Sequence, residues 1–188
     1  MTTRKAVECA LSLGSCLGDR LRHLREARAA IAAIPGVTII AASPVYETEP
    51  VGVKPEFAAL HYLNAVLILE TTLTADALRA TLARIEEAAG RVRTEDKYAP
   101  RTLDIDILYH GDEFRSSPEL SLPHPRWADR RFVVQPLADV RPDHILPGST
   151  VTVAERLALL PIHPAVRKFT DQWPPIEAVG RPESNPQT

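Results

Sequence analysis

The chain has 188 residues, of which 45% are hydrophobic and 24% are charged. This length and composition are typical of one globular domain and exclude a wholly disordered protein. The net charge of −2 excludes the basic surplus of a generic binder of nucleic acid or anionic membranes. Proline is frequent, and 12 of the 17 prolines lie from Pro118 onward. Regular structure is therefore expected in the first part of the chain, with loops, short elements and a tail behind it.

The cysteines and the hydropathy pattern indicate a cytoplasmic protein. Cys9 and Cys16 are the only cysteines, and no Cys/His cluster is present, so two free thiols in a reducing compartment are expected. No apolar run approaches the roughly 18 residues that a membrane span needs. The N-terminal residues also lack the apolar stretch of a signal peptide.

Apolar periodicity predicts three elements at the start of the chain. A strand over residues 5–13 is followed by a helix over 20–34, which begins at the N-cap Asp19. The β-branched, apolar run 37–46 predicts a second strand. Residues 47–61 contain two prolines and one glycine, namely Pro50, Pro55 and Gly52, and are expected to form a long loop.

The next part of the chain predicts a strand over residues 62–70, a helix over 75–89 and a fourth strand over 103–109. Between the last two, residues 91–101 are polar and lack any period. A loop of this length within a compact domain is usually functional or disordered.

The remaining residues predict shorter elements. Residues 121–137 combine a Pro-rich loop, a short helix and a short apolar strand, and 152–160 predict one more helix. We expect a single domain over 1–160 and a loose, Pro-rich C-terminal tail over 161–188. The order β-α-β-β-α-β is the ferredoxin-like arrangement, an α+β fold with both helices on one face of an antiparallel sheet. The other face and its loops would be open to a ligand.

The strongest local signal for chemistry is the pair Asp104 and Asp106. On a strand these side chains share one face, while Leu103, Ile105 and Ile107 face the core. Adjacent carboxylates repel each other, and a hard cation such as Mg²⁺ relieves the repulsion because it prefers oxygen ligands. A solvated polar strand face is the alternative interpretation, because Asp-x-Asp is short.

Basic residues precede this pair in the irregular loop, namely Arg91, Arg93, Lys97 and Arg101. Arginines beside a metal-binding pair suit phosphate transfer, because they neutralise charge on phosphoryl oxygens. An ordinary charged loop is the alternative, because acidic residues in the same loop balance part of the charge. No phosphate-binding sequence of the type GxxxxGK[ST] is present.

Three other features attract attention. Tyr62 and Asn64 share a face of the third predicted strand, and an aromatic ring beside an amide is a platform for a flat heterocycle. A tyrosine at the edge of the core explains the same position. His124 lies between two prolines, where a lone histidine is more often structural, and Phe132 by itself would be assigned to the core.

Seven sequence blocks, taken in order, resemble the 6-hydroxymethyl-7,8-dihydropterin pyrophosphokinase family. The blocks are LSLGSCLGD, SPVYETEPVG, YLNAVLILE, IEEAAGRVR, KYAPRTLDIDIL, LPHPRW and RRFVVQPL. The resemblance covers residues 7–160 and implies a ferredoxin-like enzyme of folate synthesis. Such an enzyme transfers a pyrophosphoryl group from ATP to the hydroxymethyl oxygen of the reduced pterin and releases AMP. The resemblance also implies that the substrates are small molecules and that the protein is a monomer.

The resemblance further implies roles for individual residues. Two Mg²⁺ ions would be bound by Asp104 and Asp106, which together with Arg91 and Arg101 would be the catalytic residues. The ATP site would be lined by Glu86, Arg91, Arg101, Ser121, His124 and Arg130. The pterin would lie between Tyr62 and Phe132, and its edge would be bonded by Asn64, Thr48 and the backbone near Val51.

The sequence departs from the family pattern at several positions. Cys16 stands where asparagine is usual, Glu49 replaces an apolar residue or proline, and Tyr98-Ala99 stands where Trp-Gly is often found. The loop 52–61 is a few residues longer than in many relatives. None of these changes removes a predicted metal ligand.

Two other function classes stay open at this point. One is a non-catalytic ferredoxin-like module that binds RNA, which usually carries aromatic residues and a basic surplus on its sheet. Paired carboxylates on that face argue against it. The other is a degenerate family member that only binds pterin or nucleotide, which the intact aspartates and arginines disfavour.

Overall fold

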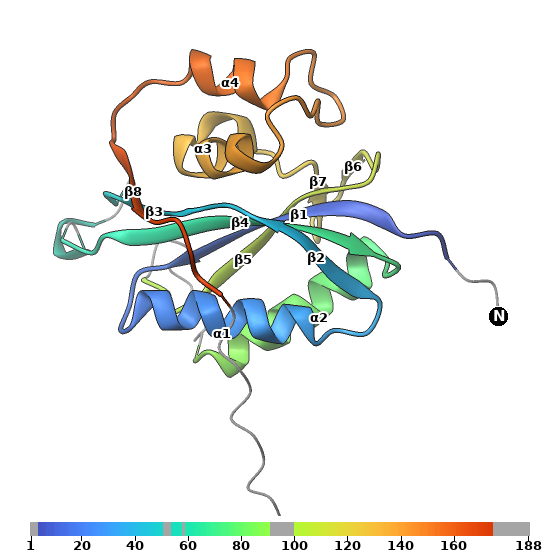
Figure 1. The fold of residues 1–188 in the computed structure, drawn as a ribbon, viewed down its shortest axis with the longest axis horizontal. Coiled ribbons are helices and arrows are strands. Elements are labelled where there is room, and N and C mark those ends of the chain that lie inside the picture. The colour runs from blue at the N-terminus through green and yellow to red at the C-terminus, as the bar shows by residue number, and fades with distance from the viewer. Residues whose placement is uncertain (1–3, 51–53, 58, 91–99, 175–188) are drawn as a thin grey trace, which may run out of the picture.

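A six-stranded antiparallel sheet forms the centre of the molecule (Figure 1). The computed structural model describes residues 4–50, 54–57, 59–90 and 100–174. The strands of this sheet are β1 (Val7–Ser15), β2 (Val37–Ala42), β3 (Val45–Thr48), β4 (Tyr62–Thr71), β5 (Asp104–His110) and β8 (Val166–Thr170). The short β6 (Arg115–Ser116) and β7 (Ser121–Leu122) pair with each other. The helices are α1 (Arg20–Ala32), α2 (Ala75–Ala88), α3 (Arg131–Val140) and α4 (Val153–Leu159).

The strand order confirms the predicted ferredoxin-like fold. The path across the sheet is β5-β1-β4-β3-β8, and β2 also pairs with β4. The single strand expected over 37–46 is instead two strands, because Ser43 and Pro44 interrupt the strand. Pro44 has no N–H group to donate to a neighbouring strand. The Ser43 amide donates to the Val66 carbonyl oxygen of β4, and the Ser43 hydroxyl oxygen accepts from the Val66 amide.

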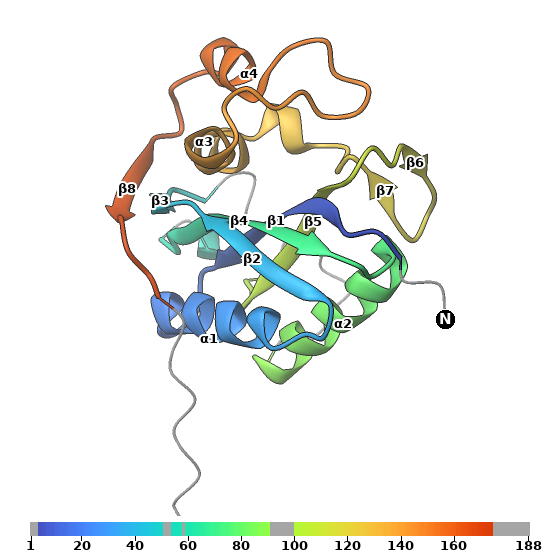
Figure 2. The same ribbon diagram turned by 45° about the vertical axis from the view of Figure 1, so that its right-hand side comes forward.

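One face of the sheet packs against α1 and α2, as the sequence predicted (Figure 2). Asp19 caps α1 by accepting a hydrogen bond from the Arg22 amide, and Thr74 caps α2 in the same way. The apolar sides of both helices cover alternate residues of the strands, such as Leu63 and Leu67 of β4. This layer is the larger part of the hydrophobic core.

The opposite face is only partly open, which differs from the expectation. Residues predicted as a short apolar strand form α3, which lies on the sheet with α4 outside it (Figure 2). The β-branched pair Val133-Val134 suggested a strand, but with Leu137 these residues form one buried helix side that packs on β4. Tertiary burial therefore outweighs local strand propensity here.

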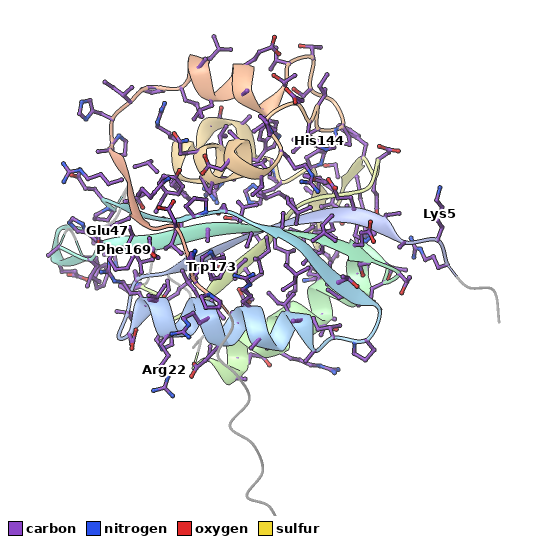
Figure 3. All side chains as sticks on the ribbon, in the orientation of Figure 1. Lys5, Arg22, Glu47, His144, Phe169 and Trp173 are labelled. Carbon is purple, nitrogen blue, oxygen red and sulfur yellow. The ribbon has the colours of Figure 1, made fainter. Side chains whose placement is uncertain are left out.

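The expectation of a loose tail from Pro161 is wrong for residues 166–174. Strand β8 pairs with β3 at the edge of the sheet, and Trp173 is buried beside α1 (Figure 3). Its indole Nε1 donates a hydrogen bond to the Ser43 carbonyl oxygen at 2.7 Å. The folded unit thus extends well beyond residue 160. None of the helices in the described ranges is long and apolar enough to span a bilayer.

Candidate active site

A cavity of about 840 Å³ lies where the sheet face is not covered by α3. It extends from β3 across β4, β1 and β5 to the side of α2, and the start of α3 and the Pro-rich loop before it close the far side. Of the thirteen predicted site residues, eleven line this cavity. They are Thr48, Tyr62, Asn64, Glu86, Arg101, Asp104, Asp106, Ser121, His124, Arg130 and Phe132. Arg91 and Val51 lie outside the described residues.

Asp104 and Asp106 project from β5 into the cavity, with side chains that are 32% and 42% exposed. The residues between and beside them, Leu103, Ile105 and Ile107, are buried in the core below α1 and α2. This alternation confirms the predicted separation of the two faces of the strand. The acidic pair is accessible to a ligand while its backbone is fixed by the core.

Small residues on the neighbouring strand keep the space above the aspartates open. Gly14 lies opposite Asp104 in the register of β1 and β5, and Ser12 lies opposite Asp106. On its other side Gly14 faces Asn64, whose side-chain oxygen would be 3.3 Å from an added Cβ. A larger residue at Gly14 would crowd the cavity floor between the acidic pair and Asn64.

The aspartates suit Mg²⁺ that is shared with another ligand. Within the described ranges, no group of three or more His, Cys, Asp and Glu residues is arranged to hold a metal ion. Mg²⁺ typically takes one or two carboxylates and completes its six oxygen ligands with water and substrate phosphates. Two accessible carboxylates beside an open cavity match that donor set.

Arg101 contacts the acidic pair directly, because its Nη1 atom lies 2.9 Å from Asp104 Oδ2. Its backbone is held by Cys16: the Arg101 amide donates to Sγ at 3.2 Å, and the Cys16 amide donates to the Arg101 carbonyl oxygen at 3.2 Å. Cys16, one of the departures from the family pattern, therefore fixes the loop that carries Arg101. No local pattern in the sequence indicates this pairing across 85 positions.

The opposite end of the cavity carries the polar and aromatic groups. Asn64 donates to the Thr48 hydroxyl at 2.8 Å, and both side chains are buried. Tyr62 lies two residues from Asn64 on the same face of β4, and burial together with the Cys16 thiol raises the pKa of Tyr62 to about 12. Its phenol therefore stays neutral near pH 7. Phe132, the second residue of α3, lines the cavity from the far side, with the Arg130 guanidinium 5.6 Å from its ring.

His124 lines the cavity as a neutral ring. Burial, followed by the positive charges of Arg130 and Arg126, lowers the pKa of His124 to about 4. Its Nδ1 atom accepts a hydrogen bond from the Arg126 amide, which assigns the ring proton to Nε2. That Nε2 atom lies 3.8 Å from Asp106 Oδ2. The ring can thus donate a hydrogen bond to an anionic group near the acidic pair.

Glu86 lies at the α2 end of the cavity and is buried. Its Oε1 atom accepts a hydrogen bond from the Ile105 amide at 2.7 Å. The carboxylate therefore ties α2 to the strand that carries both aspartates, in addition to its place in the cavity wall.

Some cavity residues were not predicted from the sequence. Arg79 lies seven residues, or two helical turns, before Glu86 on α2. This spacing places both residues on the same side of the helix and could have indicated that Arg79 lines the cavity. His163, Pro164 and Val166 reach the cavity from the predicted tail. No local pattern in the sequence indicates that this segment returns to the sheet edge.

Comparison with known proteins agrees with these features. A sequence profile described as 7,8-dihydro-6-hydroxymethylpterin-pyrophosphokinase (HPPK) matches residues 10–142. A 2-amino-4-hydroxy-6-hydroxymethyldihydropteridine pyrophosphokinase of Methylorubrum extorquens is 39% identical over 144 residues, which are 77% of this chain and 89% of that protein. A protein with the same description from Bacillus subtilis is 38% identical over 130 residues, 69% of this chain and 75% of its own length.

Longer proteins also match. A solved Plasmodium falciparum HPPK-DHPS structure shares the fold, with a TM-score of 0.66 and 14% identity, and the match covers 84% of this chain and 44% of that chain. The folic acid synthesis protein fol1 of Pneumocystis carinii is 35% identical over 144 residues, 77% of this chain and 19% of that protein. This chain thus spans less than half of each of these two longer proteins. The profile match and the curated relatives show that the chain belongs to the 7,8-dihydro-6-hydroxymethylpterin-pyrophosphokinase family.

Proposed function

We propose that this protein transfers the pyrophosphoryl group of ATP to the hydroxymethyl oxygen of 6-hydroxymethyl-7,8-dihydropterin, releasing AMP, as a step of folate synthesis. The observation that carries the proposal is the meeting of two kinds of group in one cavity. The acidic pair Asp104 and Asp106 lines the cavity on β5, and the aromatic and amide side chains of Tyr62, Asn64 and Phe132 line the same cavity. A metal–phosphate group and a flat heterocycle can therefore bind side by side.

In this proposal Asp104 and Asp106 would hold two Mg²⁺ ions at the site where the triphosphate of ATP binds. When bound, these ions would supply positive charge that offsets the charge of the triphosphate. The chain contributes two carboxylates on strand β5. The hydrogen bond from the Ile105 amide to the Glu86 carboxylate holds this strand against α2. A fixed strand limits the reorganisation needed at the moment of reaction.

Cationic and neutral donors around the acidic pair would bind the rest of the triphosphate. Arg101 is held beside Asp104 by its side chain and by Cys16. His124 presents a neutral Nε2–H group, and Arg130 also lines the cavity. Ser121 and Glu86 complete the proposed ATP site, and Arg91 is proposed to close over it.

The pterin would bind between the rings of Tyr62 and Phe132. The neutral phenol of Tyr62 and the apolar ring of Phe132 favour stacking on a flat bicyclic ring. Asn64 and Thr48 line the cavity and are fixed by the hydrogen bond between them, and their remaining amide and hydroxyl groups would bond the pterin edge. The backbone near Val51 is proposed to contribute to the same edge.

The proposed reaction forms one O–P bond and breaks another. The hydroxymethyl oxygen attacks the β-phosphorus of ATP, and the bond from that phosphorus to the α,β-bridging oxygen breaks. AMP leaves with the bridging oxygen and the electron pair, and the hydroxyl proton passes to solvent water. Because such transition states are loose, positioning and charge neutralisation matter more than a strong base.

The products of a single incubation test this proposal. The protein is mixed with ATP, Mg²⁺ and 6-hydroxymethyl-7,8-dihydropterin, and nucleotides and pterins are separated by chromatography. We expect AMP and a pyrophosphorylated pterin in equal amounts. Formation of ADP would instead indicate transfer of a single phosphoryl group, and AMP no higher than with an Asp104→Ala, Asp106→Ala double variant would contradict the proposal.

Three finer points belong to the same proposal. We propose that the chain works as a monomer, in the cytoplasm and without nucleic acid. Its two free cysteines are buried, which suits a reducing compartment. An RNA-binding module is disfavoured because the sheet face that would stack bases carries Asp104 and Asp106.

A further inference from the structure

The C-terminal segment 161–174 lies outside the part of the chain that matches the family profile, which ends at residue 142. It nevertheless contributes His163, Pro164 and Val166 to the cavity wall. In Figure 2 it descends from α4 along the edge of the sheet to α1, so that it joins the two helical layers. We call these residues the C-terminal strap.

The strap is fixed at both ends. At its start, the Arg131 guanidinium donates to the carbonyl oxygens of Leu160 at 3.0 Å and Pro161 at 3.4 Å. Arg131 is the first residue of α3, next to Phe132. At its end, Trp173 is buried, bonds the Ser43 carbonyl oxygen and has the Arg28 guanidinium 5.1 Å from its ring. The strap is thus bonded to the rest of the fold on both sides of its cavity-lining residues.

Between these anchors, β8 lies directly against the strand that carries Thr48. Val166 is opposite Thr48 in the register of β3 and β8, and Lys168 is opposite Tyr46. Strand β3 has only four residues and lies between β4 and β8. Without β8 it would be an exposed edge strand, with one row of backbone groups unpaired. The position of the Thr48 hydroxyl therefore depends on β8 as well as on β4.

We propose that the C-terminal strap forms the outer wall of the pterin end of the cavity, and that Val166 is a specificity-determining residue that limits the space beside Thr48. This inference rests on the proposed function, because it names the pterin as the molecule against that wall. Adding bulk at Val166 would displace the heterocycle, and removing bulk would loosen its fit. The ATP end, at the acidic pair on the opposite edge strand, would be unaffected.

Two tryptophan substitutions in β8 test the inference. Val166→Trp adds a large ring at a cavity-lining position, while Phe169→Trp makes a smaller change at a half-exposed position of the same strand that is not among the described residues lining the cavity. Calorimetry measures the affinity for 6-hydroxymethyl-7,8-dihydropterin and, separately, for a non-hydrolysable ATP analogue with Mg²⁺. We expect Val166→Trp to weaken pterin binding by about tenfold or more and to leave nucleotide binding within about twofold. Phe169→Trp should change neither.

Val166→Ala keeps the test decisive if the larger substitution impairs folding. It should weaken pterin binding several-fold while the melting temperature and nucleotide affinity stay close to those of the wild type. If a folded Val166→Trp protein bound pterin as tightly as the wild type, the inference would be overturned and the proposed function would stand. If Val166→Trp does not fold, wild-type affinity for pterin in Val166→Ala would have the same meaning. A wild-type protein that binds no pterin would overturn the proposed function and the inference with it.

Discussion

The two faces of the central sheet carry different kinds of side chain although the same strands build both. On β4, Leu63 and Leu67 are buried under α1 and α2, while Tyr62 and Asn64 face the cavity. On β5, the buried Ile105 separates two accessible aspartates. Beside the cavity, the period of two in a strand thus separates core side chains on one face from cavity-lining side chains on the other, while the part of the second face under α3 is also buried core. Adjacent positions should therefore respond to substitution in opposite ways.

The largest effect on activity is expected on the cavity face. Asp106→Ala should lower turnover by at least about 10³-fold, because it removes half of the donor set for the charge-neutralising ions. The unfolding free energy of the ligand-free protein should change by less than about 0.5 kcal/mol, since Asp106 is 42% exposed and its loss relieves repulsion. Steady-state AMP release and thermal unfolding check both parts. A large fall in melting temperature would place Asp106 among the structural residues instead.

The next effect concerns the anchor of the C-terminal strap. Trp173→Ala should cost about 3–5 kcal/mol of unfolding free energy, because it empties a buried site between β2, β3 and α1. Trp173→Phe keeps most of the apolar volume and should cost less, with the lost hydrogen bond to Ser43 contributing about 1 kcal/mol. Denaturant unfolding measures the pair. Equal stability of Trp173→Ala and the wild type would show that the anchor is not part of the core.

A smaller loss of stability is expected on the helical face of β4. Leu67→Ala should cost about 2–5 kcal/mol, since Leu67 is fully buried under the two helices. Turnover per folded molecule should stay near that of the wild type at a temperature where the variant is folded. If turnover fell as far as in Asp106→Ala, the two faces would not be functionally separate.

The smallest effect concerns an ion pair distant from the cavity. Burial raises the pKa of Glu8, but hydrogen bonds from Arg141 and Tyr109 outweigh this and hold it below the usual range. Because the folded pKa is lower than the unfolded one, this carboxylate stabilises the protein above about pH 4.5, and the contribution is lost as the pH falls through the folded pKa.

Glu8→Gln should therefore flatten the dependence of unfolding free energy on pH between about 5 and 3. Chemical unfolding at a series of pH values measures this, with wild type as the reference. Identical pH profiles for the two proteins would show that Glu8 makes no such contribution. Turnover at pH 7 should be unchanged, since Glu8 is absent from the described cavity lining.

The sequence was most informative where a local pattern decides the structure. The alternation of Asp104, Ile105 and Asp106 predicted both faces of β5, because a strand has a fixed period and the apolar residues must be buried. The caps Asp19 and Thr74 located the starts of α1 and α2 to within one residue. These features need no knowledge of distant contacts.

The sequence was least informative where distant contacts decide. Val133 and Val134 favour a strand locally, yet burial against β4 makes this segment the helix α3. Strand β8 has few apolar residues, and its structure depends on pairing with β3 and on the anchoring of Trp173. The hold of Cys16 on Arg101 likewise depends on two loops that meet only in the folded protein.

The most direct test of the central claim counts divalent cations on the cavity face. Electron paramagnetic resonance can measure bound Mn²⁺, in place of Mg²⁺, in the presence of a non-hydrolysable ATP analogue and the pterin. We predict two bound ions per wild-type chain and fewer in Asp106→Ala, with Leu67→Ala resembling the wild type. The same number of ions in Asp106→Ala and wild type would contradict the assignment of the cavity face as the metal-dependent site.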